Sequence, residues 1–362
     1  MALSSCRSDD PEPVRPTVRT VLVYMVANNS LGENGYNYDK LDLDEMRRAA
    51  ASGQLGGSRW IVYHHAYRTD PVLLEVTADG IVNLKSYDTS VVSVSASRMN
   101  EVIADMKSIA PADDYGLILW SHASGWPEDG LDESDYFASR SYGQDNGKTM
   151  NITTLARVLS GKGFSFIYND CCNMACVEVA YELRGVTDWF LGSATELPGD
   201  GTCYDRTMQY FTSAQADLRS VAETTYNYYV TRPSSAGAWY TAGLVRMDAL
   251  DALASETRRI YTDSKYPAGY TPMNLDIQIG RKRYYDFRNF AEALAPADKA
   301  WSDAFDAAVT FHIGMPKFGS LDVSEQCGLA TFIQRAASDA VYKGYDRLQW
   351  YKDVARFQPL PE

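Results

Sequence analysis

The sequence predicts an α/β fold, a doubly wound α/β/α sandwich with a mostly parallel central sheet and a C-terminal subdomain. Four short apolar runs, at residues 20–28, 59–67, 115–122 and 164–170, lack clean alternation, and a fifth strand is expected at 188–196. Such runs are typical of strands that are covered on both faces, as in a parallel sheet. Helical patterns lie between them, and this alternation favours helices on both faces of the sheet.

The helical segments expected between these strands cover residues 38–51, 95–110, 151–161 and 174–185. In the second of them the apolar side chains form a stripe at helical spacing: Met99, Val102, Ile103, Met106 and Ile109. From about residue 206 the pattern is mainly helical, and after about 266 the signals weaken. We therefore predict a flexible tether over 1–18, a main domain over 19–265 and a C-terminal subdomain over 266–362.

Composition and charge exclude several classes of protein. The 362 residues carry a net charge of -13, from 34 basic and 47 acidic side chains. A nucleic-acid partner is not expected, because neutralising phosphates requires a basic face. The sequence has no run of about 18 apolar residues of the kind that spans a membrane. Six cysteines in a chain of this length are too few for a disulfide scaffold.

The first residues resemble the end of a bacterial lipoprotein signal. In "LSSC", Cys6 would become the lipidated first residue of the mature protein, and "RSDDPEPVRP" would be a polar tether. A charged and an apolar signal region do not precede this match. We expect a lipoprotein of the cell envelope or surface of a Gram-negative bacterium, or a secreted protein, with membrane contact only through Cys6.

Two of the predicted strands end in side chains that suit nucleophilic catalysis. One leads into Ser121 and His122, and the other into Asp170, Cys171 and Cys172. Ligands bind at the carboxyl ends of strands in open α/β sheets. A histidine beside a cysteine lowers the thiol pKa and favours the attacking thiolate. A helix beginning near Met174 would add its positive end beside Cys172.

The alternation of side chains along a strand indicates which cysteine faces the cleft. Asp170 and Cys172 share one face and Cys171 takes the other. If Asp170 faces the cleft, Cys172 does too, and Cys171 and Cys176 are small buried side chains.

Other readings of these residues remain open. Each cysteine could be ordinary core, and Asp170 could cap the following helix. Cys171, Cys172, Cys176 and a histidine could supply four zinc ligands, but their spacing matches no common zinc pattern. We expect no metal site.

Four blocks of the sequence resemble the clostripain-like cysteine peptidases. They are "VLVYMVANNSLGENGYNYDKLDLDEM", "YGLILWSHASGW", "YNDCCNMACVEVAYEL" and "ATELPGDGTCYD", which lie in the expected order within residues 19–210. This family belongs with caspases, gingipains and legumain. The resemblance implies a caspase-like sandwich with the peptidase domain over 19–265, and cleavage of peptides or proteins after Arg and sometimes Lys.

The same resemblance implies roles for individual residues. His122 is the expected base and Cys172 the nucleophile, and the N–H groups of Ala123 and Cys172 form the expected oxyanion hole. A carboxylate suits a guanidinium by bidentate pairing. The candidates for that pocket are Asp170, then Asp200, then Glu196.

Many members of this family are activated by self-cleavage after a basic residue between the two catalytic blocks. A long Gly-, Asp- and Ser-rich loop covers residues 126–149, and Arg140 and Lys148 are its candidates for cleavage. We expect a monomer that requires no cofactor. Calcium supports activity in some relatives, but no motif here indicates it.

Two departures from the family pattern leave an alternative function open. Ala123 stands where the family commonly has glycine, and alanine does not readily take a positive φ. Asn173 also replaces the usual apolar residue. The alternative is a catalytically weak or inactive peptidase-like surface lipoprotein that binds peptide or glycan.

Overall fold

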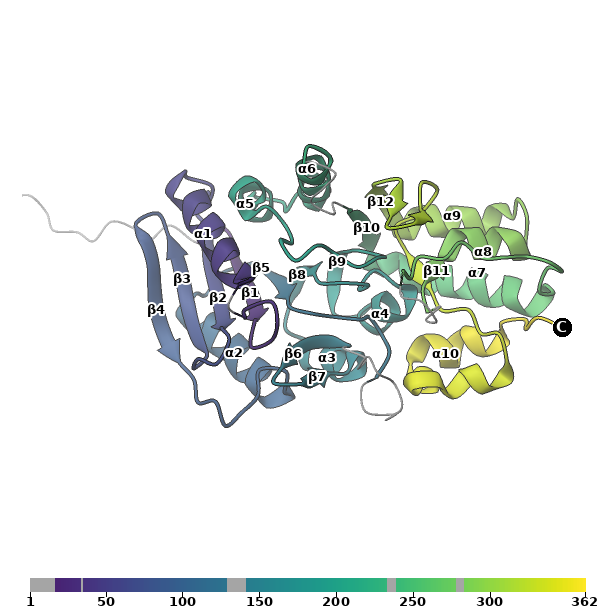
Figure 1. Ribbon diagram of the computed structural model, residues 1–362, viewed down its shortest axis with the longest axis horizontal. Coiled ribbons are helices and arrows are strands. Elements are labelled where there is room, and N and C mark those ends of the chain that lie inside the picture. The colour runs from purple at the N-terminus through teal and green to yellow at the C-terminus, as the bar shows by residue number, and fades with distance from the viewer. Residues whose placement is uncertain (1–16, 34, 129–140, 233–238, 278–282) are drawn as a thin grey trace, which may run out of the picture.

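A nine-stranded sheet forms the centre of the computed structural model (Figure 1), which describes residues 17–33, 35–128, 141–232, 239–277 and 283–362. The strand order is β12-β10-β9-β8-β5-β1-β2-β3-β4. The strands are β1 (Thr20–Val26), β2 (Arg59–His65), β3 (Val72–Thr77), β4 (Gly80–Ser86), β5 (Tyr115–Trp120), β8 (Phe164–Asp170), β9 (Thr187–Gly192), β10 (Thr241–Arg246) and β12 (Val309–Gly314).

The middle of the sheet is parallel, as the sequence predicts. Strands β2, β1, β5, β8 and β9 run in the same direction. Antiparallel strands extend both edges, with β3 and β4 on one side and β10 and β12 on the other. All five strands predicted from the sequence are present, and they are these five parallel strands. The antiparallel strands β3 and β4 carry a weaker signal because they are less uniformly buried, and every residue of β4 is exposed or half-buried.

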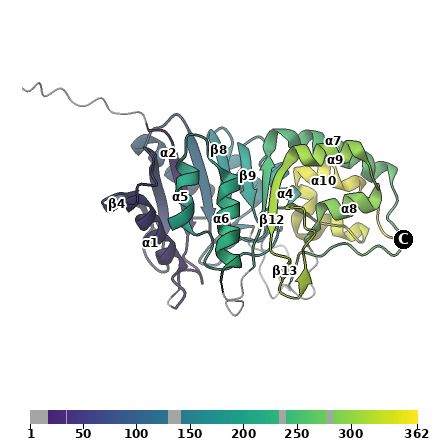
Figure 2. The same ribbon diagram turned by 90° about the horizontal axis from the view of Figure 1, so that it is seen from above.

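Helices cover both faces of the sheet (Figures 1 and 2). One face carries α1 (Tyr38–Ala51), α5 (Tyr204–Thr212) and α6 (Leu218–Val230), and the other carries α2 (Ala96–Ile109), α3 (Ile152–Leu159) and α4 (Val177–Glu182). Each layer buries its own apolar cluster against the sheet. These observations confirm the α/β/α sandwich.

The C-terminal part packs against the α4 side of the molecule. It contains α7 (Leu250–Asp263), α8 (Phe287–Leu294), α9 (Lys299–Ala308), α10 (Gln349–Asp353) and the short pairs β11 (Tyr285–Asp286) with β15 (Ala330–Thr331) and β13 (Lys317–Phe318) with β14 (Leu321–Asp322). Its core is continuous with that of α2, α3 and α4. Strand β12 returns to the central sheet, so the boundary at 265/266 stays a prediction.

The helix expected over 174–185 is shorter than predicted. Helix α4 begins at Val177, and Cys176 before it has an extended backbone. Asn173 N–H and Ala175 N–H donate to the carbonyls of Thr195 and Ser193, both at 2.9 Å, so this stretch pairs with the chain after β9 rather than with itself. The helix of six residues starts five positions after Cys172, which removes the expected contribution of its N-terminal end.

In the part of the chain that the structure describes, none of the helices has the length and apolar character needed to cross a bilayer.

Candidate active site

The carboxyl ends of three neighbouring parallel strands define the candidate site. Met25 of β1 lies opposite Trp120 of β5, and Trp120 lies opposite Asp170 of β8. His122 lies two residues after Trp120, and Cys172 lies two residues after Asp170. Since adjacent strands lie about 4.8 Å apart, the loops that carry these two side chains emerge side by side. The chain leaves β1 and β5 toward opposite edges of the sheet, and ligands bind at such a switch point.

The loops after β5 and β8 are in close contact. Gly125 has a φ of +73°, and a Cβ atom at this position would lie 2.8 Å from the carbonyl oxygen of Asn173 and 2.6 Å from the Tyr284 hydroxyl. The Tyr284 hydroxyl also donates a hydrogen bond to the carbonyl of Ser124. A larger residue at position 125 would therefore push the histidine and cysteine loops apart.

The two adjacent thiols after β8 lie in different environments. Cys171 is 2% exposed, its Sγ donates to the carbonyl of Leu119 at 3.0 Å, and burial raises the pKa of its thiol. Cys172 is half-buried, and its Sγ accepts a hydrogen bond from the Leu197 N–H at 3.3 Å. Every other cysteine among the described residues is buried, so Cys172 is the accessible thiol of that part of the chain.

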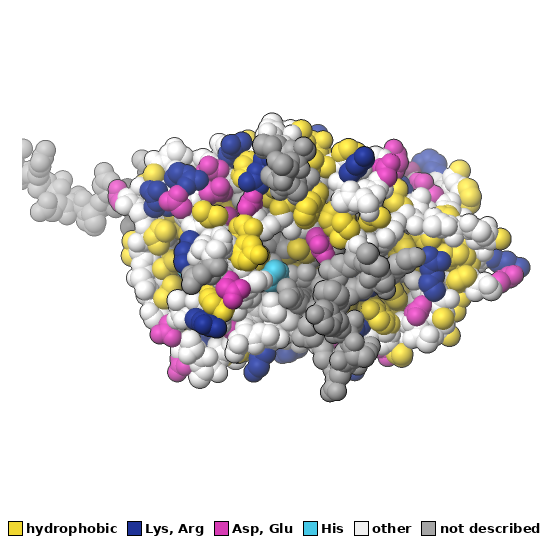
Figure 3. All heavy atoms as spheres, in the orientation of Figure 1, with side chains coloured by type: hydrophobic (Ala, Val, Ile, Leu, Met, Phe, Trp, Pro, Cys, Tyr) yellow, Lys and Arg dark blue, Asp and Glu magenta, His cyan; other side chains and the backbone are white. Residues whose placement is uncertain are grey.

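His122 is held by the chain on two sides. Its ring Nε2 lies 2.8 Å from the Ser30 hydroxyl, in the loop after β1. Its carbonyl accepts a hydrogen bond from Gly143 N–H at 2.9 Å, in β6 (Tyr142–Asp145). The side chain is half-buried. In Figure 3 one histidine is visible near the middle of the face, in a hollow bordered by hydrophobic and acidic side chains.

Ala123 fits its backbone without strain. It forms an isolated antiparallel bridge with Tyr142 and does not have a positive φ. No hydrogen bond from its N–H is found within the described residues. Of the two departures from the family pattern, Ala123 lacks a positive φ, whereas Asn173 has a φ of +57°.

Asp170 is a buried carboxylate with one unpaired oxygen. It is 6% exposed, and its Oδ2 accepts from the Tyr204 hydroxyl at 2.8 Å and from Thr202 N–H at 3.2 Å. Within the described structure its Oδ1 has no hydrogen-bond partner. Burial raises the pKa of Asp170 to about 6, against the lowering effect of these two hydrogen bonds. Gly201 permits the close approach, because a Cβ there would lie 2.8 Å from Oδ2.

The other two acidic candidates lie in the loop between β9 and α5. Asp200 forms an ion pair with Arg232, and the guanidinium of Arg232 also lies 4.9 Å from the centre of the Tyr228 ring. Glu196 is half-buried, and its carbonyl accepts from Trp239 Nε1 at 3.0 Å. Asp200 directly precedes Gly201, whose backbone approaches the Asp170 carboxylate.

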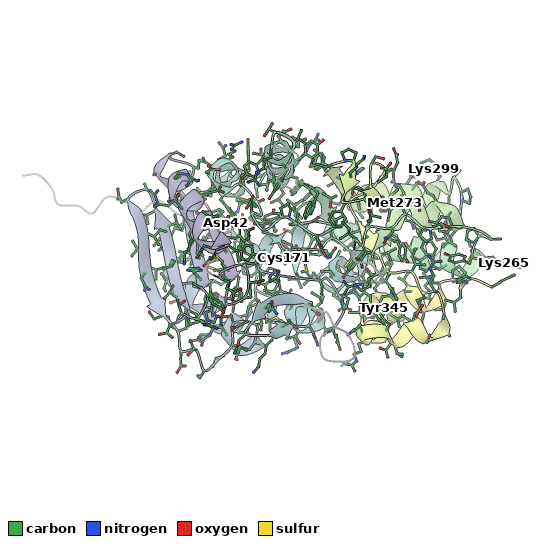
Figure 4. The ribbon with its side chains drawn as sticks, viewed as in Figure 1. Asp42, Cys171, Lys265, Met273, Lys299 and Tyr345 are labelled. Carbon is green, nitrogen blue, oxygen red and sulfur yellow. The ribbon has the colours of Figure 1, made fainter. Side chains whose placement is uncertain are left out.

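A further carboxylate lies behind this group. Asp42 of α1 is buried and accepts a hydrogen bond from Trp120 Nε1 at 2.6 Å. Burial, followed by the charge of Asp170, raises the pKa of Asp42. Figure 4 labels Asp42 and Cys171 in this central region of the molecule. The carboxyl groups of Asp42 and Asp170 therefore both lie near the end of β5, on the face of the sheet that α1 covers.

Of the candidates for self-cleavage and lipidation, one, Lys148, lies within the residues that the structure describes. Cys6 and Arg140 lie outside them. Lys148 is exposed at the start of β7 (Lys148–Met150), where it pairs with Asp145 across a turn of Asn146 and Gly147 that both have positive φ. The Ser141 hydroxyl donates to the carbonyl of Pro127 at 2.7 Å, so the two ends of the intervening segment are joined.

Within the described ranges, no three His, Cys, Asp or Glu side chains come together as ligands for a metal ion. The zinc set considered from the sequence is not assembled there, because Cys171 and Cys176 are buried in the core cluster while Cys172 faces outward.

Several residues that contact the site, through side chains or backbone N–H groups, were not predicted from the sequence. They are Ser30 at His122, Leu197 at Cys172, Thr202 and Tyr204 at Asp170, and Arg232 at Asp200. Ser30 had a usable signal, since it follows β1, the strand next to β5. The other contacts come from loops and helices whose approach depends on tertiary packing.

Comparison with known proteins places the chain among peptidases. The model of the clostripain family matches residues 23–291. No match was found among curated proteins. The structure resembles an inactive zymogen C11 protease from Parabacteroides distasonis, with a TM-score of 0.82, 28% identity, and coverage of 94% of this chain and 99% of that chain.

A second similar structure is a secreted C11 cysteine protease from Bacteroides thetaiotaomicron in complex with an irreversible peptide inhibitor. Its TM-score is 0.76 and its identity 26%, and the match covers 92% of this chain and 98% of that chain.

Proposed function

This chain belongs to the clostripain family of cysteine peptidases, and we propose that it is an endopeptidase that cleaves after Arg, and after Lys, through a Cys172–His122 dyad. The observation that carries the proposal is the pair of side chains at adjacent strand ends. The accessible thiol follows β8, and the half-buried imidazole follows β5, which pairs with β8 in register. Their loops touch at Gly125 and Asn173.

The proposed reaction passes through a thioester. His122 takes the thiol proton of Cys172, and Cys172 Sγ attacks the carbonyl carbon of the substrate. His122 then gives that proton to the leaving amine as the C–N bond breaks. Water then attacks the thioester while His122 takes its proton, and the C–S bond breaks to release the acid. The N–H groups of Ala123 and Cys172 would hold the oxyanion, and the unstrained Ala123 backbone is compatible with this role.

Asp170 supports the preference for a basic side chain. A buried carboxylate with one unpaired oxygen is a strong acceptor for a guanidinium, because a charge-assisted hydrogen bond would satisfy it. Asp200 already pairs with the guanidinium of Arg232, which supports its capacity to contact such a group. Asp170 is therefore the first pocket residue in the proposal, Asp200 the second and Glu196 the third.

Self-cleavage in the 126–149 loop is part of the proposal, and one of the similar structures is an inactive zymogen. Arg140 is the first candidate. Lys148 is the second, because an endopeptidase would first have to separate it from Asp145 in the β6–β7 hairpin. The contact between Pro127 and Ser141 would keep both ends of the cut segment docked.

The proposed setting is outside the cytoplasm, and a similar protease is described as secreted. We propose a monomer that acts on peptides or proteins with basic residues, anchored by lipid at Cys6 or secreted. The proposal includes no nucleic acid and no cofactor, and calcium has no motif to support it.

The nucleophile is tested by comparing Cys172→Ala with Cys171→Ala on an arginyl reporter peptide. We expect the first variant to lose turnover completely and to keep its thermal stability, because Cys172 packs little against the core. The second removes a buried thiol and should retain activity, with a loss of stability of about 1 kcal/mol. Turnover that survives the first substitution and disappears in the second would overturn the assignment.

A further inference from the structure

Ser30 is placed directly against the proposed catalytic imidazole. Its hydroxyl lies 2.8 Å from His122 Nε2, although 92 positions separate the two residues. Ser30 follows β1, which lies beside β5 in the sheet. The contact therefore joins the ends of two neighbouring strands at the switch point of the fold.

The loop that carries Ser30 is held by the amide side chain of Asn29. That amide is 7% exposed, and its Nδ2 donates to the carbonyl of Val26 at 2.9 Å and to the carbonyl of Gln144 at 2.7 Å. It also lies 3.4 Å from the hydroxyl of Ser121, the neighbour of His122. Its Oδ1 accepts from Leu31 N–H at 2.9 Å, immediately beyond Ser30.

The same amide thus holds both partners of the Ser30–His122 contact. It anchors the residue on either side of Ser30, and it touches Ser121 and the strand β6 that binds the His122 carbonyl. A surface hydroxyl on a loose loop contributes little to orientation, because ordering it costs entropy. Here the loop is already ordered by buried hydrogen bonds, so the hydroxyl is preorganised.

We propose that Ser30 is a positioning residue that fixes the orientation and tautomer of His122. The Ser30 oxygen accepts a hydrogen bond from Nε2–H, which places the exchangeable proton of the reaction on Nδ1, the nitrogen that serves Cys172. The serine can accept from Nε2–H in both the neutral and the charged ring, so it is compatible with both steps of the reaction. This inference rests on the proposed Cys172–His122 dyad and extends it to a third side chain.

The test compares Ser30→Ala, Ser30→Thr and Ser30→Asp, with Ser97→Ala as control for the loss of an exposed hydroxyl elsewhere. For Ser30→Ala we expect kcat on an arginyl reporter to fall about tenfold with KM unchanged, since a residue that acts only through His122 affects the chemical step. Ser30→Thr should restore kcat to within about threefold of wild type, because it keeps the hydroxyl. Ser97→Ala should match the wild type.

Ser30→Asp gives a readout that a structural role would not produce. A carboxylate against Nε2 stabilises the imidazolium, which in turn stabilises the Cys172 thiolate, so alkylation of Cys172 by iodoacetamide should begin at lower pH than in the wild type. Unchanged kcat in Ser30→Ala, or an unshifted profile in Ser30→Asp, would overturn the proposal. Alkylation needs no substrate, so it also reports on a chain that is isolated as a zymogen.

His122→Ala separates failure of this inference from failure of the proposed function. If that substitution leaves the alkylation profile of Cys172 unchanged, the dyad is wrong and the role of Ser30 falls with it. If His122→Ala alters the profile and the Ser30 variants do not, the dyad stands and only the positioning role is wrong.

Discussion

Asp170, at the end of β8, and Glu178, in α4, are two buried carboxyl groups with similar local chemistry. Asp170 is 6% exposed and Glu178 is fully buried, and each has one oxygen without a hydrogen-bond partner in the described structure. Burial raises the pKa of Asp170 to about 6 and that of Glu178 to about 7. Neither burial nor the pKa shift alone distinguishes a binding group from a structural one.

Their surroundings differ. Glu178 Oε1 accepts from Phe332 N–H at 2.8 Å and from the Thr331 hydroxyl at 3.0 Å, with the Tyr345 hydroxyl at 3.5 Å, so it joins α4 to the C-terminal part. Asp170 lies two residues before the accessible thiol, beside a loop that carries further acidic side chains. The comparison indicates that a perturbed carboxyl becomes a candidate for function only where it borders an open site.

The largest expected effect is on Asp170→Asn. Replacing the carboxylate by an amide of the same shape removes the charge that would pair with a basic substrate, and we expect kcat/KM for an arginyl peptide to fall about 100-fold or more. Thermal stability at pH 8 should not decrease, because the buried charge is removed. A variant that cleaves arginyl peptides as the wild type does would make Asp170 a structural residue like Glu178.

The matched substitution Glu178→Gln should change stability and leave kcat/KM unaltered. Glu178 has a folded-state pKa of about 7 against an ordinary value of 4.5, so its favourable contribution is present below pH 4.5 and is lost as pH rises through about 7. The free energy of unfolding of the variant, relative to that of the wild type, should therefore rise by about 1–3 kcal/mol when the pH is raised from 5 to 8. Chemical denaturation at the two pH values measures this gain, and a difference that does not change with pH would contradict it.

The smallest expected effect is on Arg232→Ala, which releases Asp200 from its ion pair. If Asp200 is the second pocket carboxylate, KM for arginyl peptides should fall about threefold, since exposed and half-buried ion pairs are worth roughly 1 kcal/mol. Arg219→Ala, in the preceding helix α6, removes an exposed pair with Glu223 and serves as control. An unchanged KM in Arg232→Ala would place Asp200 outside the pocket. Asp170 would then be the pocket carboxylate without help from Asp200.

The parallel half of the fold could be predicted from the sequence because its signals are local. Runs such as 20–26 and 164–170 are buried on both faces and need no partner to be identified. The antiparallel strands β3 and β4 were not predicted, since their half-exposed side chains give a mixed pattern. The start of α4 was also wrong, because the backbone of Asn173 and Ala175 bonds to a distant segment.

By itself, the sequence determined the five parallel strands of the sandwich and the two blocks that carry His122 and Cys172, since both are patterns within short stretches of chain. Only the tertiary structure decided which oxygen of Asp170 lacks a partner, and that Ser30 and Arg232 reach His122 and Asp200. These contacts join residues 32 to 92 positions apart. They depend on register and loop packing, which arise from the energy of the whole fold rather than from local preference.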